Sequence, residues 1–308
     1  TQRILDKFQQ ANIITIHHYK NVFNRPRQDF WRQKESQNII LAVKDEPFLY
    51  EGPDICENFG NENFYYASTV LNCIYDCHYC YLQGMYQSAN IVIFVNIEDF
   101  FEEVDRQLKR LGSMYICTSY DTDLLALEAI IPYSREWGNF AKDRENLLME
   151  LRTKSANYSS IEDMEPCKNI ILAWTLSPEE VIERYETHTP SLDARIDAIC
   201  KALADGWNVR LSLEPIAKID NWEGVYTEFI HMLGQEIPID EIYDINIGVF
   251  RMSKDYFKSI GKNRLDTDIF SHAREIRDGV VCYREEEYMK SAIAKELFKY
   301  YPNDKIYI

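Results

Sequence analysis

Apolar residues recur along the chain in short runs, and amphipathic stretches separate these runs. The runs have strand length and are rich in branched and aromatic residues; they cover 64–71, 91–95, 113–118, 148–154, 169–176, 208–213 and 242–249. Helical patterns lie between them at 98–111, 123–130, 136–148, from 178, 191–205 and 222–233. A strand followed by a helix, repeated about six times, predicts an α/β fold in which outer helices cover a parallel sheet.

The ends of the chain carry further patterns. Residues 5–11 predict a short helix, and the apolar runs at 13–16 and 39–43 predict strands. After the last β/α repeat, 251–284 has room for a hairpin, and 285–300 predicts a closing helix. About six repeats are too few for a closed barrel of eight strands.

Three cysteines stand close together in the loop after the run at 64–71. Cys73, Cys77 and Cys80 have the spacing C-x3-C-x2-C. Iron–sulfur clusters are held by cysteine thiolates, and three ligands leave one iron of a four-iron cluster open to a small molecule. A structural zinc site is the alternative: His78 could be a fourth ligand, although no second Cys or His pair follows at finger spacing. Disulfides are the third possibility, but eight cysteines and no signal peptide indicate a reducing compartment.

At these residues the chain resembles the radical S-adenosylmethionine superfamily. The motif has an aromatic residue, Tyr79, before its last cysteine, and the longer run CHYCYLQ at 77–83 is similar to the spore photoproduct lyase family. The resemblance implies a partial (β/α)6 TIM-like barrel at 63–250, with an N-terminal α/β extension at 1–62. It also implies a C-terminal extension at 251–308 that holds a possible DNA-binding hairpin and the closing helix.

The same resemblance implies a chemistry. Members of the family use a four-iron ([4Fe-4S]) cluster and S-adenosylmethionine to make a 5′-deoxyadenosyl radical. They split the thymine dimer 5-thyminyl-5,6-dihydrothymine in DNA and need an electron donor such as flavodoxin or ferredoxin. The three cysteines would be the metal ligands.

Working groups of such folds lie at the carboxyl ends of the strands. This rule selects Cys117, Lys154, Thr175 and Glu214, each at the end of a predicted strand. By resemblance, Cys117, followed by Thr and Ser, would donate a hydrogen atom to the product radical, and a thiol suits that task because its S–H bond is weak. The resemblance also implies that Tyr79 and Tyr81 pass a hydrogen atom between the thiyl radical and the cofactor radical. It implies that Ser119, Lys154 and Thr175 bind the amino-acid end of the cofactor.

Net charge complicates a DNA substrate. The chain carries a formal charge of −16, whereas phosphate contacts need Lys and Arg. The basic residues gather locally, however: 17–34 has five against one acidic residue, and 251–284 has eight against five. We therefore expect DNA contacts there. The alternatives are a diverged radical enzyme acting on a peptide or another modified nucleic acid, or a non-catalytic iron–sulfur or zinc module that binds nucleic acid. No apolar run reaches membrane-spanning length, so we expect a cytoplasmic protein.

Overall fold

The computed structural model describes residues 1–308, which form two compact units. Unit 1 comprises Thr1–Ile74, Tyr86–Thr153 and Ser159–Ile171; unit 2 comprises Tyr75–Met85, Lys154–Tyr158 and Leu172–Ile308. None of the helices combines the length and the apolar character needed to cross a membrane. The domain boundaries predicted at residues 62 and 250 stay a prediction.

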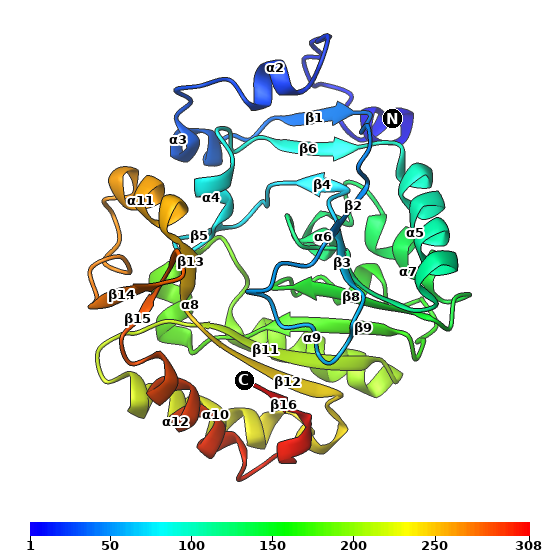
Figure 1. Cartoon of the computed structure of the whole chain (residues 1–308). Coiled ribbons are helices and arrows are strands. Elements are labelled where there is room, and N and C mark those ends of the chain that lie inside the picture. Colours follow the sequence, from blue (N-terminus) through cyan, green and yellow to red (C-terminus); the bar gives the residue numbers. More distant parts are fainter. The chain divides into compact units, whose positions relative to one another are not determined.

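Unit 1 contains strands of two sheets (Figure 1). Its strands are β1 (Ile39–Ala42), β2 (Leu49–Glu51), β3 (Phe64–Ala67), β4 (Val70–Leu71), β6 (Ile91–Phe94), β7 (Met114–Cys117) and β8 (Leu147–Thr153). Its helices are α1 (Gln2–Lys7), α2 (Lys20–Phe23), α3 (Phe30–Lys34), α5 (Ile97–Leu111), α6 (Leu124–Leu127) and α7 (Tyr133–Ala141). Strands β3, β7 and β8 pair in parallel, with β2 antiparallel at the edge, while β1, β6 and β4 form the second sheet.

The parallel pairing in unit 1 brings strand ends together. The register sets Tyr66 of β3 opposite Cys117 of β7, and Cys117 opposite Glu150 of β8. All residues of β6 and β7 are buried, as expected for strands in the middle of a core. Helix α5 buries Phe100, Val104 and Leu108 along one stripe, with acidic residues in its first turn and basic residues in its last.

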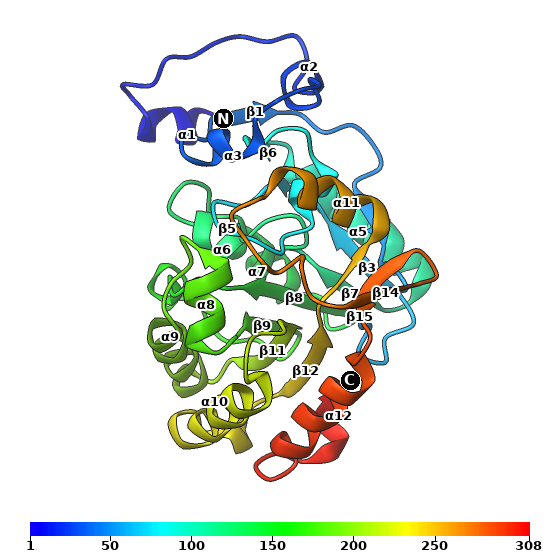
Figure 2. The same ribbon diagram turned by 90° about the vertical axis from the view of Figure 1, so that its left-hand side faces the viewer.

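Unit 2 contains the other half of the repeats. Its strands are β5 (Asp76–Cys77), most of β9 (Ile170–Thr175), β10 (Glu186–Thr187), β11 (Asn208–Ile216), β12 (Asp244–Val249), β13 (Arg251–Ser253), β14 (Arg274–Arg277), β15 (Val280–Tyr283) and β16 (Ile306–Tyr307). Its helices are α4 (Leu82–Met85), α8 (Glu179–Tyr185), α9 (Leu192–Asp205), α10 (Trp222–Glu236), α11 (Lys254–Asn263) and α12 (Glu286–Leu297). The strand order is β9-β11-β12-β16, and Figure 2 shows α8, α9 and α10 in a column along these strands. Short 3-10 turns lie at Tyr158–Ser160, Ile239–Glu241 and Asn303–Lys305.

Most predicted elements are present, and three differ in an informative way. The apolar run at 13–16 forms no strand, and Ile13 and Ile14 are exposed. The single strand predicted at 64–71 is two strands, because β3 pairs with β7 whereas β4 pairs with β6 of the other sheet. The helix predicted at 136–148 is α7, which ends at Ala141, before β8 begins. The hairpin expected in 251–284 is present as β14 and β15, with positive φ at Asp278 and Gly279 in its turn.

Candidate functional site

Cys117 ends β7 in unit 1 with its thiol buried. Its Sγ donates to Oε1 of Glu150 at 3.8 Å. Glu150 is itself held: the Tyr115 hydroxyl donates to Oε2 at 2.6 Å, and Arg152 Nε donates to Oε1 at 2.9 Å. Burial, and after it the Glu150 carboxylate, raise the pKa of the Cys117 thiol. The side chain is therefore a protonated thiol, which is the form a hydrogen-atom donor requires.

Ser119 lies two residues beyond Cys117 and is tied to the end of β8. Its hydroxyl donates to the carbonyl of Arg152 at 2.7 Å and accepts from the amide of Arg152 at 2.7 Å. Thr118 adds a hydrogen bond to the carbonyl of Glu150 at 3.2 Å. Two strand ends are thereby joined at fixed register, as the rule of carboxyl ends predicted.

The start of the cysteine loop is anchored in unit 1. Asn72 has a positive φ of 68° and donates from Nδ2 to the carbonyls of Ser88 and Asn90 at 2.7 and 2.8 Å. The carbonyl of Cys73 accepts from Lys34 Nζ at 2.6 Å and from Gln37 Nε2 at 3.0 Å. These contacts fix the backbone at Cys73. They also engage Lys34, one of the basic residues that the sequence assigned to DNA.

The rest of the loop belongs to unit 2. Cys77 lies on β5 opposite Glu186 of β10, and the amide of Cys80 donates to the carbonyl of Cys77 at 3.0 Å. Gln83 Nε2 donates to the same carbonyl at 2.6 Å. Tyr81 begins the turn into α4, where its carbonyl accepts from the amides of Gly84 and Met85.

Arg264 fastens this loop to the segment after α11. Its guanidinium is buried and donates to both carboxylate oxygens of Asp76 at 2.8 Å, and to Oε1 of Gln83 at 2.9 Å. A bidentate pair of this kind is geometrically specific. Nearby, a Cβ on Gly84 would lie 2.6 Å from the Cβ of Tyr256, so only glycine lets α4 approach α11 this closely.

Glu186 is the centre of a buried charge cluster in unit 2. Oε2 accepts from Arg195 Nη2 at 2.6 Å, and Oε1 accepts from the Tyr79 hydroxyl and lies 3.6 Å from Lys154 Nζ. Ser177 adds a hydrogen bond to Oε1 at 3.2 Å. Burial alone would raise the pKa of Glu186, but Lys154, Arg195 and the hydrogen bonds outweigh it and lower the pKa to about 2.

Three predicted site residues therefore lie around Glu186: Lys154 and Thr175, predicted to bind the cofactor, and Tyr79, predicted to return hydrogen. Lys154 Nζ lies 5.6 Å from the centre of the Tyr79 ring. Thr175 is buried, and its carbonyl accepts from Arg195 Nη1 at 3.2 Å. Burial and then Glu186 raise the pKa of Tyr79 well above its usual value, so this phenol keeps its proton. Glu214, also selected by the strand-end rule, accepts from Asn246 Nδ2 at 2.8 Å.

The donor set at the cysteines fits an iron–sulfur cluster in its chemistry. Cys73, Cys77 and Cys80 are all free of disulfides, and hydrogen bonds hold the backbone at each end of the loop. Within neither unit do three or more Cys, His, Asp or Glu side chains gather into a metal-binding group, and Cys73 belongs to unit 1 whereas the other two belong to unit 2. Their shared role as ligands stays a prediction.

Sequence reasoning missed the buried charges that support these residues. Glu150 and Arg152 gave a weak signal, because they interrupt an otherwise apolar strand. Glu186 and Arg195 gave no signal, since a carboxylate after one helix and a cation within the next look like surface residues. Only the fold reveals that both are buried.

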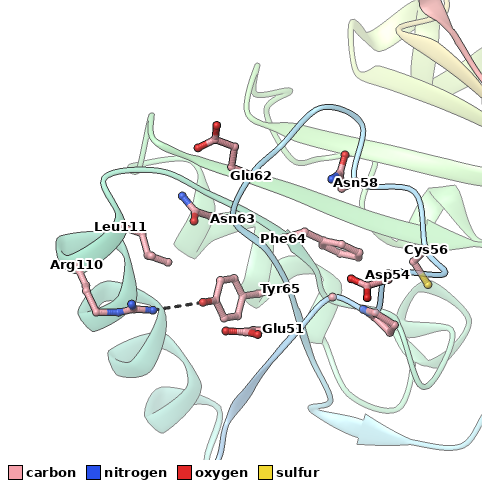
Figure 3. Close-up of a pocket in the computed structure, with 12 residues that line it drawn as sticks. Glu51, Asp54, Cys56, Asn58, Glu62, Asn63, Phe64, Tyr65, Arg110 and Leu111 are labelled. Atoms are coloured by element: carbon pink, nitrogen blue, oxygen red, sulfur yellow. Dashed lines mark hydrogen bonds between the residues drawn. The ribbon is translucent and has the colours of Figure 1, made fainter.

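A pocket in unit 1 lies away from these groups (Figure 3). It has a volume of about 500 Å³ and lies at the beginning of β3, whereas Cys117 lies at the end of the neighbouring strand. Three carboxylates line it, together with Arg110, which donates to the Tyr65 hydroxyl at 3.3 Å. None of the predicted site residues lines this pocket, and its acidic lining does not suit phosphate.

Comparisons with known proteins agree with this picture. A family model described as spore photoproduct lyase matches residues 63–307. The spore photoproduct lyase of Bacillus subtilis (strain 168) is 23% identical over 328 residues, which cover 99% of this chain and 92% of that protein. The spore photoproduct lyase of a Geobacillus species (strain Y412MC61) is 22% identical over 187 residues, 59% of this chain and 54% of that protein.

Solved structures show the same fold. A cysteine-to-alanine variant of spore photoproduct lyase with dinucleoside spore photoproduct superposes with a TM-score of 0.83 at 19% identity, covering 99% of this chain and 93% of that one. A double variant with bound AdoMet and the same dinucleoside gives a TM-score of 0.81 at 19% identity, with the same coverage. This likeness confirms the predicted α/β fold of the partial-barrel type.

Proposed function

Because the chain belongs to the spore photoproduct lyase family, we propose that it is a radical S-adenosylmethionine lyase that splits the spore photoproduct in DNA. Some of the solved lyase structures whose fold it shares hold dinucleoside spore photoproduct, in one case together with AdoMet. The observation that carries the proposal is the buried thiol of Cys117 at the end of β7, 3.8 Å from the Glu150 carboxylate, in surroundings that raise the pKa of the thiol. Such a thiol is a poor nucleophile and a poor metal ligand, but it is a good hydrogen-atom donor.

The protein's part in the reaction is to bind, orient and return hydrogen. Cys73, Cys77 and Cys80 would hold the [4Fe-4S] cluster. When bound, the cluster and S-adenosylmethionine would supply radical chemistry that abstracts hydrogen from the substrate. Cys117 would then transfer its S–H hydrogen to the product radical.

Binding and hydrogen return would fall to the residues around Ser119 and Glu186. Lys154 is a compact cation that suits the cofactor's carboxylate, while the hydroxyls of Ser119 and Thr175 would hold the rest of its amino-acid end. Tyr79 and Tyr81 would pass a hydrogen atom back after Cys117 has given up its own. The Tyr79 phenol keeps its proton, as this role requires.

The C-terminal extension offers a surface for DNA. In the stretch 251–284, Arg264 and Arg274 serve the interior: Arg264 binds Asp76, and Arg274 stacks on three aromatic rings. The basic side chains that remain exposed, all in unit 2, are Lys254, Lys258, Lys262, Arg277 and Arg284. Arg277, which also pairs with Glu275 and Glu286, lies beside the turn of the β14–β15 hairpin. We propose this hairpin as the DNA contact, with base extrusion required to bring the lesion to a buried radical.

One experiment tests the lyase activity. The protein is reconstituted with iron and sulfide without oxygen, reduced, and incubated with S-adenosylmethionine and a synthetic dinucleoside photoproduct. We expect two restored thymine residues by mass spectrometry. A Cys117→Ala protein should keep its cluster spectrum and its cofactor cleavage but give a diverted product. Loss of the cluster in this variant would show that Cys117 is a ligand and not a donor. Absence of product from the unchanged protein, despite cofactor cleavage, would favour a different substrate.

The electron donor belongs to the same proposal. Cluster reduction by one electron would come from a small redox protein of the flavodoxin or ferredoxin type. Replacing the chemical reductant in the assay with each purified donor in turn, and measuring the rate of product formation, identifies which of them serves.

A further inference from the structure

We propose that Glu150 is a positioning residue for Cys117: its carboxylate keeps the sulfur in the S–H form and fixes where that hydrogen lies. This inference rests on the proposed function, because only a hydrogen-atom donor needs its hydrogen retained. Nothing in the family description or the relatives' names assigns a role to this glutamate.

Contacts on both carboxylate oxygens hold the Glu150 side chain in place. Its side chain is 2% exposed, and it lies opposite Cys117 on the adjacent parallel strand. Cys117 Sγ lies 3.8 Å from Oε1, within the reach of a thiol hydrogen bond. Because Tyr115 and Arg152 hold the two carboxylate oxygens, the acceptor has one orientation, and the thiol hydrogen has one direction.

The sign of the neighbouring charge is the reverse of that at a reactive cysteine. Nucleophilic and metal-binding cysteines lie beside cations or helix N-termini, which favour the thiolate. Cys117 instead faces a carboxylate, and a second negative charge on its sulfur is unfavourable. The Glu150 carboxylate thus disfavours loss of a proton from the Cys117 thiol. It does not oppose transfer of a hydrogen atom, because that transfer leaves the sulfur neutral.

The transfer balances without any proton moving to Glu150. The S–H bond breaks homolytically, and the hydrogen atom's electron pairs with the unpaired electron of the product radical to form the new C–H bond. The sulfur is left as a neutral thiyl radical. Glu150 stays a carboxylate throughout. The hydrogen atom returned later restores the thiol, and the hydrogen bond to Glu150 forms again.

Few charged or titratable groups act on this sulfur. Glu150 raises the pKa of Cys117, as does the more distant thiol of Cys56, whereas Arg152 and a hydrogen bond from the backbone at Ser119 lower it. The opposite signs of Glu150 and Arg152 provide a discriminating test, because a loosened structure would expose the thiol in either variant.

The test measures alkylation of Cys117 by iodoacetamide as a function of pH, resolved by peptide mass spectrometry, in the full-length chain without its cofactors. In Glu150→Gln we expect the alkylation rate at pH 8 to rise about tenfold, the effect of a shift of about one pH unit in the titration. In Arg152→Gln we expect the rate to stay level or fall. Glu103→Gln, a change at a buried carboxylate of α5 that does not contact Cys117, is the matched control and should behave like the unchanged protein.

Two results would overturn the inference: equal rates in Glu150→Gln and the unchanged protein, or faster alkylation in both Glu150→Gln and Arg152→Gln. Glu150→Asp, which restores the charge, should return the rate toward that of the unchanged protein. The lyase assay then separates the two proposals. If the unchanged protein makes no thymine product, the proposed function fails while the alkylation result stands. If it does, both proposals remain in force, and the alkylation rates alone decide the role of Glu150.

Discussion

The buried charge cluster of unit 2 yields a prediction about stability. Glu186→Gln removes one negative charge but keeps the side chain's size. The variant leaves Arg195, whose side chain is fully buried, without its carboxylate partner, and it leaves Lys154 without the carboxylate 3.6 Å away. Removing one partner of a buried ion pair leaves an uncompensated charge and costs about 3–5 kcal/mol of unfolding free energy.

The lowered pKa of Glu186 gives the same interaction a pH dependence. The pKa falls from 4.5 to about 2 in the folded protein. A depressed pKa means that the charged form stabilises the fold above pH 4.5, and that this contribution is lost as the pH falls from 4.5 toward 2. The direction of this shift fits the loss of stability expected when the pair is broken.

The assay is urea unfolding of the cofactor-free protein, followed by circular dichroism at pH 7 and pH 3. We expect Glu186→Gln to lower the unfolding free energy by about 3–5 kcal/mol at pH 7 and by clearly less at pH 3. In a cycle with Arg195→Met, the double variant should cost less than the two single variants together, by about 2–3 kcal/mol. Asp105→Asn breaks a partly exposed pair with Arg144 and should cost less than about 1 kcal/mol.

Two outcomes would refute the reasoning. One is a Glu186→Gln protein as stable as the unchanged protein at pH 7. The other is strict additivity with Arg195→Met. Either would mean that water or movement of Arg195 relieves the charge, and that Glu186 does not organise the residues around it.

Three further predictions concern binding. Replacing Cys73, Cys77 or Cys80 by Ala should remove the iron and the electron paramagnetic resonance signal of the reduced cluster. The control variant Cys200→Ala, on α9, should keep both. If one of the three variants keeps its iron and its signal, the replaced cysteine is not a ligand. Lys154→Met should weaken S-adenosylmethionine binding about tenfold or more in calorimetry while the cluster spectrum is kept, since a charged hydrogen bond is lost; unchanged affinity would place the carboxylate elsewhere. Arg277→Ala in the hairpin should weaken duplex DNA retention and reduce the salt slope by about one, whereas Lys201→Ala on α9 should not; equal effects would indicate non-specific attraction.

The rule of strand ends allowed the sequence to predict part of the site. The choice of Ser119 came from the family resemblance, whereas Cys117 could be selected because parallel strands bring their carboxyl ends to one edge. Strand β7 does end at Cys117, opposite Glu150 of β8, while the roles of both residues stay predictions. Lys154 was selected in the same way, but its partner was not. The partner, Glu186, follows a different helix and reaches Lys154 only through the fold.

The sequence did not predict the structure of two runs that depends on which strands pair. The run at 64–71 has the composition of one strand, yet the Ser68 hydroxyl donates to the buried Asp121 at 2.5 Å, and the strands on either side of it join different sheets. The run at 13–16 has strand composition but no strand to pair with, so it stays exposed. Composition measures how well residues fit a sheet, and it does not tell whether a neighbouring strand exists.

Glu150 and Glu186 are both buried carboxylates, but they act in different ways, and their neighbours explain why. Glu186 has two cations, Lys154 and Arg195, so its negative charge is stabilised and its removal should destabilise the fold. Glu150 pairs with Arg152 and lies beside a thiol, so its charge also acts on Cys117 and disfavours the thiolate. Replacing Glu186 should therefore appear first in unfolding curves, whereas replacing Glu150 should appear first in the reactivity of one sulfur. A glutamate can therefore serve either purpose, and its surroundings decide which. Cations around Glu186 fix a cluster of charges, whereas the thiol beside Glu150 keeps its hydrogen.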